Sequence, residues 1–309
     1  MPRDTVVSDT LESWDSKVSA DTNVFGDTKE SWAAKVSGDA LQSWATLVAG
    51  DTKVSLRKTT LVDYPGKVAA ALFFPGCGLR CPWCQNRELV LGIAGDRILR
   101  DAILRDVIPK DYVPLTVALT HIEKRRAVLG GVVISGGEPT GFAGLPALIR
   151  RIKALGLPVK LDTNGMNPTV LERLFSQQET SPDYIALDLK LPPERYGELS
   201  GNGEALKQSA ALLRTSGIAH EYRTLALPKQ STGCKRSAGC EQPIGRTELR
   251  AEELLSMVPL VDDSDWYFRP FVPGNCLDPA WDTLEKPGTA EAALLAEKAR
   301  ELGKRGIAP

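Results

Sequence analysis

From about Leu56 onward, short apolar runs alternate with longer amphipathic stretches, and this alternation constrains the fold more than any other feature of the chain. Apolar runs of this length predict buried strands, and the amphipathic stretches predict helices. A repeated strand–helix order is typical of parallel sheets, because each parallel strand needs a crossover connection to the next. The six predicted strands are VAAALFF (68–74), GVVIS (131–135), VKLDT (159–163), YIALDLK (184–190), EYRTLAL (221–227) and WYFRPFV (266–272).

Amphipathic helices are predicted between these strands. They cover residues 144–156, 204–217 and 289–303. In the first, the apolar residues recur at helical spacing and therefore share one face. Six strands separated by helices fit an α/β fold in the form of a partial (β/α)6 barrel of parallel strands. We expect this barrel to be the main domain, over residues 56–309.

Residues 1–55 differ from the rest of the chain, because they repeat themselves. DTLESWDSKVSADT at 9–22 recurs as DTKESWAAKVSGDA at 27–40 and as DALQSWATLVAGDT at 39–52, so the register moves in multiples of six residues. A six-residue period occurs in β-solenoids, but stacked repeats need several neighbours to bury a core, and here there are few. Three interpretations of this N-terminal repetitive extension stay open: a flexible segment, a small β structure, or an arm that binds a partner.

Charge and hydropathy argue against two classes of partner. Lys and Arg total 38 against 39 for Asp and Glu, so the chain as a whole has no field that attracts nucleic acid. No apolar run reaches the roughly 18 residues that a membrane span needs, and the start MPRDTVVSDT lacks the pattern of a secretory signal. We therefore expect a cytoplasmic protein that binds neither nucleic acid nor membrane.

Three of the six cysteines, Cys77, Cys81 and Cys84, fall within eight residues of the loop after the first predicted strand. Thiols clustered in this way indicate a metal site rather than a disulfide framework. Three thiolates can each bind one corner of a cubane iron–sulfur cluster and leave the fourth iron open to a small molecule. The alternative is a zinc site or a structural set of thiols. Zinc needs a fourth ligand from elsewhere, and the chain has only His121 and His220 as histidines.

The segment FFPGCGLRCPWCQN (73–86) resembles the signature of the radical S-adenosylmethionine superfamily, in which an aromatic residue, here Trp83, precedes the third cysteine. The resemblance covers about 56–305. It implies that the three cysteines hold a [4Fe–4S] cluster whose open iron binds the amino and carboxylate groups of S-adenosylmethionine. In that family the reduced cluster splits the sulfonium and leaves methionine and a 5′-deoxyadenosyl radical. The protein then has to position the cofactor and exclude water.

A second motif, ISGGEPT (134–140), ends another predicted strand. Gly136 and Gly137 carry no side chains, so we expect the backbone there to approach a ligand closely. Functional sites of parallel barrels gather at the carboxyl ends of the strands, which is where this motif lies. In the superfamily the Gly-Gly-Glu-Pro motif binds the methionyl amino group, and the resemblance implies that Glu138 lies near it.

Polar side chains also end the next two predicted strands. They are Asp162, Thr163 and Asn164 on one strand and Asp188 and Lys190 on the other. Each set alone also fits an ordinary turn or helix start, but together they indicate a common polar rim. Arg223, on the following strand, is a candidate for holding the cofactor's carboxylate through paired hydrogen bonds, with a structural ion pair as the alternative.

These strand ends resemble those of the enzymes that activate glycyl radical enzymes. The resemblance implies that Asp188 and Lys190 contact S-adenosylmethionine, and that Asp162, Asp188 and Thr163 bind a monovalent cation beside it. The phrases TTLVDYPGKVAAALFFPGC (59–77) and DYIALDLKLPPERYGELSG (183–201) are most similar to activating proteins of the anaerobic ribonucleoside-triphosphate reductase. The implied partners are that glycyl radical enzyme, as protein substrate, and a reductant such as flavodoxin or ferredoxin.

Two positions depart from the superfamily's common pattern. Gly78 stands where many relatives have Asn, and Gln85 stands where His is common. Contacts made by those side chains are therefore not carried over to this chain.

Three further cysteines, Cys234, Cys240 and Cys276, follow later in the sequence. They fit a second cluster or zinc site, a redox pair, or free thiols.

Two other functions compete with activation of a partner. One is a radical enzyme that acts on a small molecule and shares the same cofactor site. The other is a non-catalytic iron–sulfur interaction module whose Trp-bearing repeats bind a partner. The glycine motif and the charged strand ends favour an enzyme.

Overall fold

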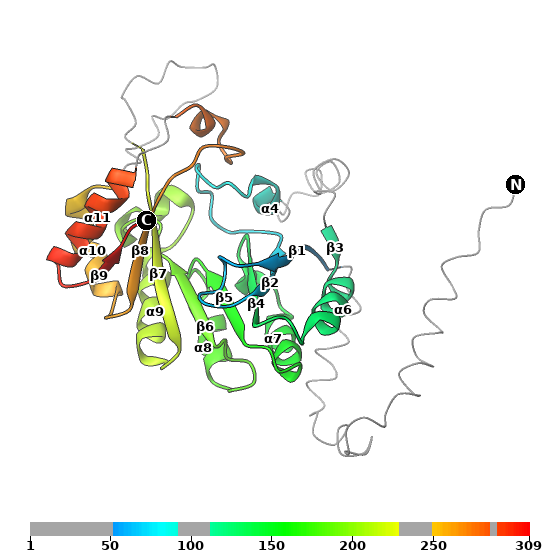
Figure 1. Cartoon of the computed structure of the whole chain (residues 1–309). Helices are drawn as coiled ribbons and strands as arrows, with labels where there is room; N and C mark the ends of the chain where they lie inside the picture. The colour runs from blue at the N-terminus through cyan, green and yellow to red at the C-terminus, as the bar shows by residue number, and fades with distance from the viewer. Residues whose placement is uncertain (1–51, 92–111, 229–248, 285–288) are drawn as a thin grey trace, which may run out of the picture. The chain divides into compact units, whose positions relative to one another are not determined.

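The computed structural model describes residues 52–91, 112–228, 249–284 and 289–309, so the repeats lie outside the described residues. Within these ranges one nine-stranded sheet runs in the order β3-β1-β2-β4-β5-β6-β7-β8-β9 (Figure 1). The strands are β1 (Lys53–Thr60), β2 (Ala69–Phe74), β3 (Tyr112–Pro114), β4 (Gly131–Gly136), β5 (Val159–Thr163), β6 (Tyr184–Asp188), β7 (Ala219–Ala226), β8 (Asp265–Pro270) and β9 (Arg305–Ile307). Neighbours from β2 through β9 pair in parallel, whereas β1 pairs antiparallel with β2 and β3.

Along the chain, helices alternate with the parallel strands, as a (β/α) barrel requires. Figure 1 shows α7, α8 and α9 along one side of the sheet. They are α4 (Arg87–Leu91), α6 (Leu115–Arg125), α7 (Leu145–Ala154), α8 (Pro168–Phe175), α9 (Gly203–Thr215), α10 (Leu254–Met257) and α11 (Thr289–Glu301). Local chemistry fixes where they begin. At α9 the Asn202 side chain accepts hydrogen bonds from the backbone N–H groups of Glu204 and Ala205, which caps the helix.

The predicted partial barrel of parallel strands is confirmed. The six predicted strands are β2, β4, β5, β6, β7 and β8, and the three predicted helices are α7, α9 and α11. Three strands at the sides of the sheet were not predicted: β1, β3 and β9. Leu56, where we placed the start of the main domain, lies inside β1, and the boundary between the repeats and this domain stays a prediction.

Side chains on the central strands alternate between two faces, as the pleat dictates. On β5, Val159 and Leu161 are fully buried on one face, and Lys160 and Asp162 point to the other. We call the face that carries Lys160, Asp162, Asp188 and Arg223 the inner face. The sheet therefore has an apolar face and an inner face rich in charge. Within the described ranges, no helix is long and apolar enough to cross a lipid bilayer.

Candidate active site

The three clustered cysteines lie in the loop between β2 and α4, at the carboxyl end of β2. The loop is held by its own backbone and by the segment before α9: Cys84 N–H donates to the Cys81 carbonyl over 3.0 Å, and Arg80 N–H donates to the Leu199 carbonyl over 2.8 Å. The Arg80 guanidinium also donates to the Cys77 carbonyl over 2.6 Å. Cys81 is buried, Cys77 and Cys84 are half-buried, and all three are free thiols.

The thiols share one electrostatic environment. Burial raises the pKa of Cys81 to about 12, opposed by the positive charge of Lys190 and reinforced by the neighbouring Cys84 and Cys77. Burial also raises the pKa of Cys77, and Lys190 again opposes the shift. Cys77 and Cys81 are therefore neutral on their own. Binding a metal would require their deprotonation, which a nearby lysine favours.

The Gly136–Gly137 turn lies against the start of the cysteine loop. Gly137 N–H donates to the Phe74 carbonyl over 2.9 Å, and Glu138 N–H donates to the Gly76 carbonyl over 2.6 Å. A Cβ on Gly137 would stand 2.1 Å from the Gly76 carbonyl oxygen, and Gly136 has a φ of +128°. We expected these glycines to let the backbone approach a ligand. In the structure they let it approach the loop that carries the cysteines, so they set the position of that loop.

Glu138 is buried and links the ends of β4 and β5. One carboxylate oxygen accepts hydrogen bonds from the Thr140 N–H, from the Thr140 hydroxyl at 2.5 Å and from the Thr163 hydroxyl at 2.8 Å, and the other accepts from Asn164 N–H at 2.7 Å. Burial raises the pKa of Glu138, and these donors oppose the shift. The Asn164 amide in turn donates to the Cys77 sulfur over 3.6 Å. Glu138 therefore connects two strand ends and, through Asn164, one of the thiols.

Four of the predicted site residues form a chain of ion pairs on the inner face. Arg223 donates from Nε to Asp188 over 2.7 Å and from a terminal nitrogen to Asp162 over 3.2 Å. Lys190 binds the other Asp188 oxygen over 3.2 Å. The burial of Asp188 would raise its pKa, but the charges of Arg223 and Lys190 prevail and lower it from 3.8 to about 2. The same carboxylates hold the pKa values of Lys190 and Arg223 above their usual range despite burial.

Two further members of this chain were missed at the level of sequence. Lys160 Nζ lies 2.6 Å from Asp162 Oδ1 and 3.7 Å from Glu221 Oε1, and its side chain is only 2% exposed. Glu221 also accepts a hydrogen bond from the Tyr184 hydroxyl over 3.1 Å. Period-two spacing could have found both residues, since Lys160 lies two positions before Asp162 and Glu221 two before Arg223.

The residues of the predicted cation site do not all bind the same partner in the structure. Asp162 and Asp188 are joined by the guanidinium of Arg223, which supplies a positive charge between them. The Thr163 hydroxyl instead donates to Glu138, away from the inner face. Arg223, which we expected to hold the cofactor's carboxylate, here binds the two aspartates. A monovalent cation at this position stays a prediction.

Trp83 is 3% exposed, and its ring packs against Trp281, with ring centroids 5.2 Å apart. This aromatic residue of the cysteine motif therefore packs against the segment after β8. Cys276 lies in the same segment and is buried, and burial raises its pKa to about 11, with smaller contributions from Asp282 and Cys84. Cys234 and Cys240 lie outside the described residues, so the second metal or redox site stays a prediction.

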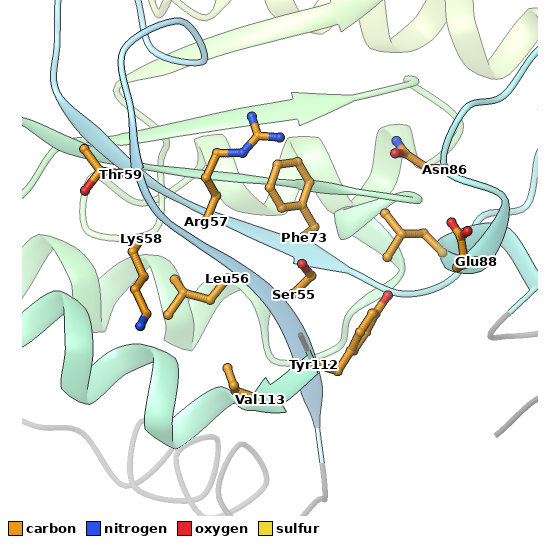
Figure 2. A pocket seen from close by; sticks show the side chains of 11 residues that line it. Ser55, Leu56, Arg57, Lys58, Thr59, Phe73, Asn86, Glu88, Tyr112 and Val113 are labelled. Carbon is orange, nitrogen blue, oxygen red and sulfur yellow. The ribbon is translucent and has the colours of Figure 1, made fainter. Parts of the chain in front are cut away.

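A pocket of about 830 Å³ opens beside α4, the helix that follows the cysteine loop (Figure 2). Its walls come from β1, from Phe73 on β2, from the start of α4 and from β3. Arg57 lies over the ring of Phe73, 5.3 Å from its centroid. Burial raises the pKa of Tyr112, another residue of the pocket wall, to about 12, and the charge of Glu88 adds to the shift. The pocket therefore offers both a cation and an anion to whatever enters it.

A family model described as the radical SAM superfamily matches residues 72–233, which is more than half of the chain. The matched span begins on β2 and contains the cysteine loop, the Gly-Gly turn and the strand ends of β5, β6 and β7. The protein belongs to the radical SAM superfamily. It is therefore an enzyme of radical chemistry, and its cofactors are a [4Fe–4S] cluster and S-adenosylmethionine.

The donor atoms of this radical SAM enzyme fit such a cluster. In the described part of the chain, no three Cys, His, Asp or Glu side chains are grouped closely enough to hold a single metal ion. An iron–sulfur cubane is wider than one ion and takes its thiolates at separate corners. Three free thiols on one short loop, with Lys190 near them to favour a negative centre, suit the cluster better than zinc.

Curated relatives of this radical SAM enzyme fall into two groups. A Methanocaldococcus jannaschii protein, provisionally named a glycyl-radical enzyme activating enzyme, is 28% identical over 256 residues, which cover 79% of this chain and 86% of that protein. The pyruvate formate-lyase-activating enzyme of Listeria monocytogenes is 30% identical over 151 residues, 47% of this chain and 55% of its own. A 7-carboxy-7-deazaguanine synthase of Aquifex aeolicus is 30% identical over 90 residues, 29% of this chain and 33% of its own.

Proposed function

We propose that this radical SAM enzyme activates a glycyl radical enzyme, by removing a hydrogen atom from the Cα of one glycine in that partner. The observation that carries the proposal is the extent of the similarity to the Methanocaldococcus protein, which spans 86% of that relative's length. The Listeria enzyme, whose name states that it activates pyruvate formate-lyase, supports the same class over about half of its length. We propose the anaerobic ribonucleoside-triphosphate reductase as the partner, on the phrases at 59–77 and 183–201.

In this proposal Cys77, Cys81 and Cys84 hold the cluster. When bound, the cluster and S-adenosylmethionine supply a one-electron reduction that yields a carbon radical. The Gly136–Glu138 turn and the ends of β5 and β6 form the cradle for S-adenosylmethionine. Hydrogen atom transfer moves a proton and an electron together to the carbon radical, so no general base is required, which agrees with the two histidines of the chain.

The ion-pair chain gives this cradle a fixed charge pattern. Asp188, whose pKa is about 2, stays ionised at neutral pH, and Lys190 stays protonated. Lys190 is thus a fixed donor for an anionic group, and its charge also acts on the Cys77 and Cys81 thiols of the cysteine loop. A cofactor that carries both a carboxylate and an amino group matches the two opposite charges of the Asp188–Lys190 pair.

The pocket beside α4 is the proposed entrance for the partner (Figure 2). One of its lining residues is Asn86, two positions after Cys84, so a segment bound there would lie close to the cysteine loop. Its volume of about 830 Å³ exceeds what a single small side chain needs. Phe73 supplies an apolar surface, and Arg57 and Glu88 supply charges that could bind a polar backbone loop.

The test is the partner's radical. Reconstituted protein, S-adenosylmethionine, a strong reductant and the purified anaerobic reductase are mixed without oxygen, and the electron paramagnetic resonance spectrum is recorded. A glycyl-radical doublet is expected with the wild-type chain and with Leu294→Ala, an exposed residue of α11 that serves as the control. It is expected to vanish with Cys84→Ala. A wild-type sample that makes 5′-deoxyadenosine but no doublet would contradict activation of this partner.

A radical enzyme acting on a small molecule is the second candidate, and the similarity to the 7-carboxy-7-deazaguanine synthase over 90 residues favours it. Many turnovers of S-adenosylmethionine per chain with a small molecule alone would support this candidate, whereas an activating enzyme needs its protein partner. Supply of electrons by flavodoxin or ferredoxin belongs to both proposals, and the cytoplasmic location stays a prediction.

A further inference from the structure

We propose that residues 271–284, which follow β8 and are called the strap here, are a positioning element that fixes the cysteine loop for cluster binding, with Trp281 as its anchor. The proposal concerns the cluster common to all radical SAM enzymes, so it does not depend on which substrate this one takes. In Figure 1 the strap runs from β8 toward the segment that leads into α4.

The strap binds the cysteine loop through its backbone. Leu277 N–H donates to the Cys84 carbonyl over 2.9 Å, and Asp278 N–H donates to the Pro82 carbonyl over 3.0 Å. These two bonds flank Trp83, on the part of the loop that carries Cys81 and Cys84. Because they hold the carbonyls on either side of this tryptophan, they limit the rotation that would turn the two thiols apart.

Side chains add a second set of links. The ring of Trp83 packs on Trp281 at 5.2 Å, and Trp281 packs edge-on against Phe271 at 5.6 Å. Trp83 is 3%, Trp281 0% and Phe271 1% exposed. On the other side of the loop, Asn275 donates to Glu88 over 2.7 Å, and the amide of Gln85 donates to the Val272 carbonyl.

The strap is held together by its own hydrogen bonds and is tied to the sheet. Asp282 is exposed, but its carboxylate accepts hydrogen bonds from Gly274 N–H over 2.9 Å and from Cys276 N–H over 3.0 Å, which closes the strap into a compact turn. Phe271 N–H donates to the Ala226 carbonyl at the end of β7. The strap thus connects the ends of β7 and β8 to the cysteine loop, which follows β2.

The cysteine loop is therefore held from two sides. The Gly136–Gly137 turn and Asn164 fix the part that contains Cys77, and the strap fixes the part that contains Cys81 and Cys84. With only one of the two sides fixed, at least one of the three thiols would be free to move with the loop. Fixing both sides presents the three thiols as one preformed set.

The test compares two equally buried tryptophans in the anaerobically reconstituted protein. Trp281→Ala removes the anchor. The control is Trp266→Ala, which removes a 0%-exposed side chain of β8; the Trp266 Nε1 donates to Thr224, and none of the described partners of Trp266 belongs to the cysteine loop. Loss of residues that orient metal ligands typically weakens metal binding about 10–100-fold, so Trp281→Ala is expected to lose iron to a chelator roughly tenfold faster than wild type. Trp266→Ala is expected to lose it at the wild-type rate, and Trp281→Phe to restore most of the retention.

The apo protein gives a readout that needs no cluster. In Trp281→Ala, alkylation of the loop cysteines, followed residue by residue by mass spectrometry, is expected to speed up at Cys81 and Cys84 more than at Cys77. Asp282→Ala loosens the strap without altering the aromatic packing and is expected to act in the same direction, so it decides the question if Trp281→Ala does not fold. Wild-type iron retention and alkylation rates in the folded variants would overturn the proposal.

Discussion

Replacing Lys160 with methionine tests whether the inner face is held together as one chain of charges. The lysine is 2% exposed and lies between Asp162, at 2.6 Å, and Glu221, at 3.7 Å, and Glu221 itself is 5% exposed. Removing one partner of a buried ion pair leaves an uncompensated charge and typically costs about 3–5 kcal/mol, so Lys160→Met is expected to lower the free energy of unfolding by that amount. Asp162 keeps its bond to Arg223, so most of the cost arises at Glu221.

The double variant Lys160→Met/Glu221→Leu separates this explanation from simple loss of packing. Removing the orphaned carboxylate as well should leave the double variant more stable than Lys160→Met alone, even though the Tyr184 hydroxyl loses an acceptor worth about 1 kcal/mol. Urea unfolding of the apo protein without oxygen, at constant m, gives the free energies. The exposed Lys207→Met is the control and should leave stability unchanged. A Lys160→Met variant no less stable than that control, or a double variant as unstable as the sum of the singles, would refute the reasoning.

Three other substitutions probe the rest of the site. Gly137→Ala would force a Cβ to 2.1 Å from the carbonyl oxygen of Gly76, so it is expected to lower the free energy of unfolding in urea by about 1–3 kcal/mol and to lower the iron content. The control is Gly141→Ala, whose Cβ meets nothing within 4 Å and which is expected to be neutral. Equal effects of the two alanines would count against the close contact. Glu138→Gln places an amide N–H₂ among four donors and is expected to lower stability by about 1–3 kcal/mol and to weaken S-adenosylmethionine binding in calorimetry; unchanged stability would mean that the carboxylate is not needed there. The pKa of Asp188 falls from 3.8 to about 2 on folding, so its stabilising effect, about 2 kcal/mol, is present above pH 4 and is lost as the pH falls toward 2. The stability difference between wild type and Asp188→Asn should therefore shrink between pH 5 and pH 2, and a difference that stays constant would contradict the assignment.

The parallel core of the sheet could be predicted from the sequence because its signals are local. The strand at Val159–Thr163 was predicted at its observed bounds, since a buried strand next to a turn signal needs no distant partner to be recognised. The antiparallel strands β1 and β3 could not be predicted, because their residues are largely exposed or half-buried, and they are strands only through pairing with β2 and with each other.

The site was partly predictable for the same reason. Cysteine spacing and strand-end residues are sequence features, and the structure brings Cys77, Glu138, Asn164 and the Asp188–Lys190 pair to one end of the sheet. Period-two spacing could have placed Lys160 on the inner face, but which charges pair with which depends on the register between β5, β6 and β7, so its ion pairs could not be predicted. The packing of Trp83 on Trp281 joins positions almost two hundred residues apart, and no local pattern announces it.

Reductive cleavage of S-adenosylmethionine by the reconstituted protein tests the central claim most directly. The protein is loaded with iron and sulfide without oxygen, its cluster is verified by spectroscopy, and 5′-deoxyadenosine and methionine are quantified after addition of a strong reductant. Both products are expected in equal amounts from the wild-type chain, and neither from Cys77→Ala, Cys81→Ala or Cys84→Ala. A fully loaded wild-type cluster that yields no 5′-deoxyadenosine would contradict the account.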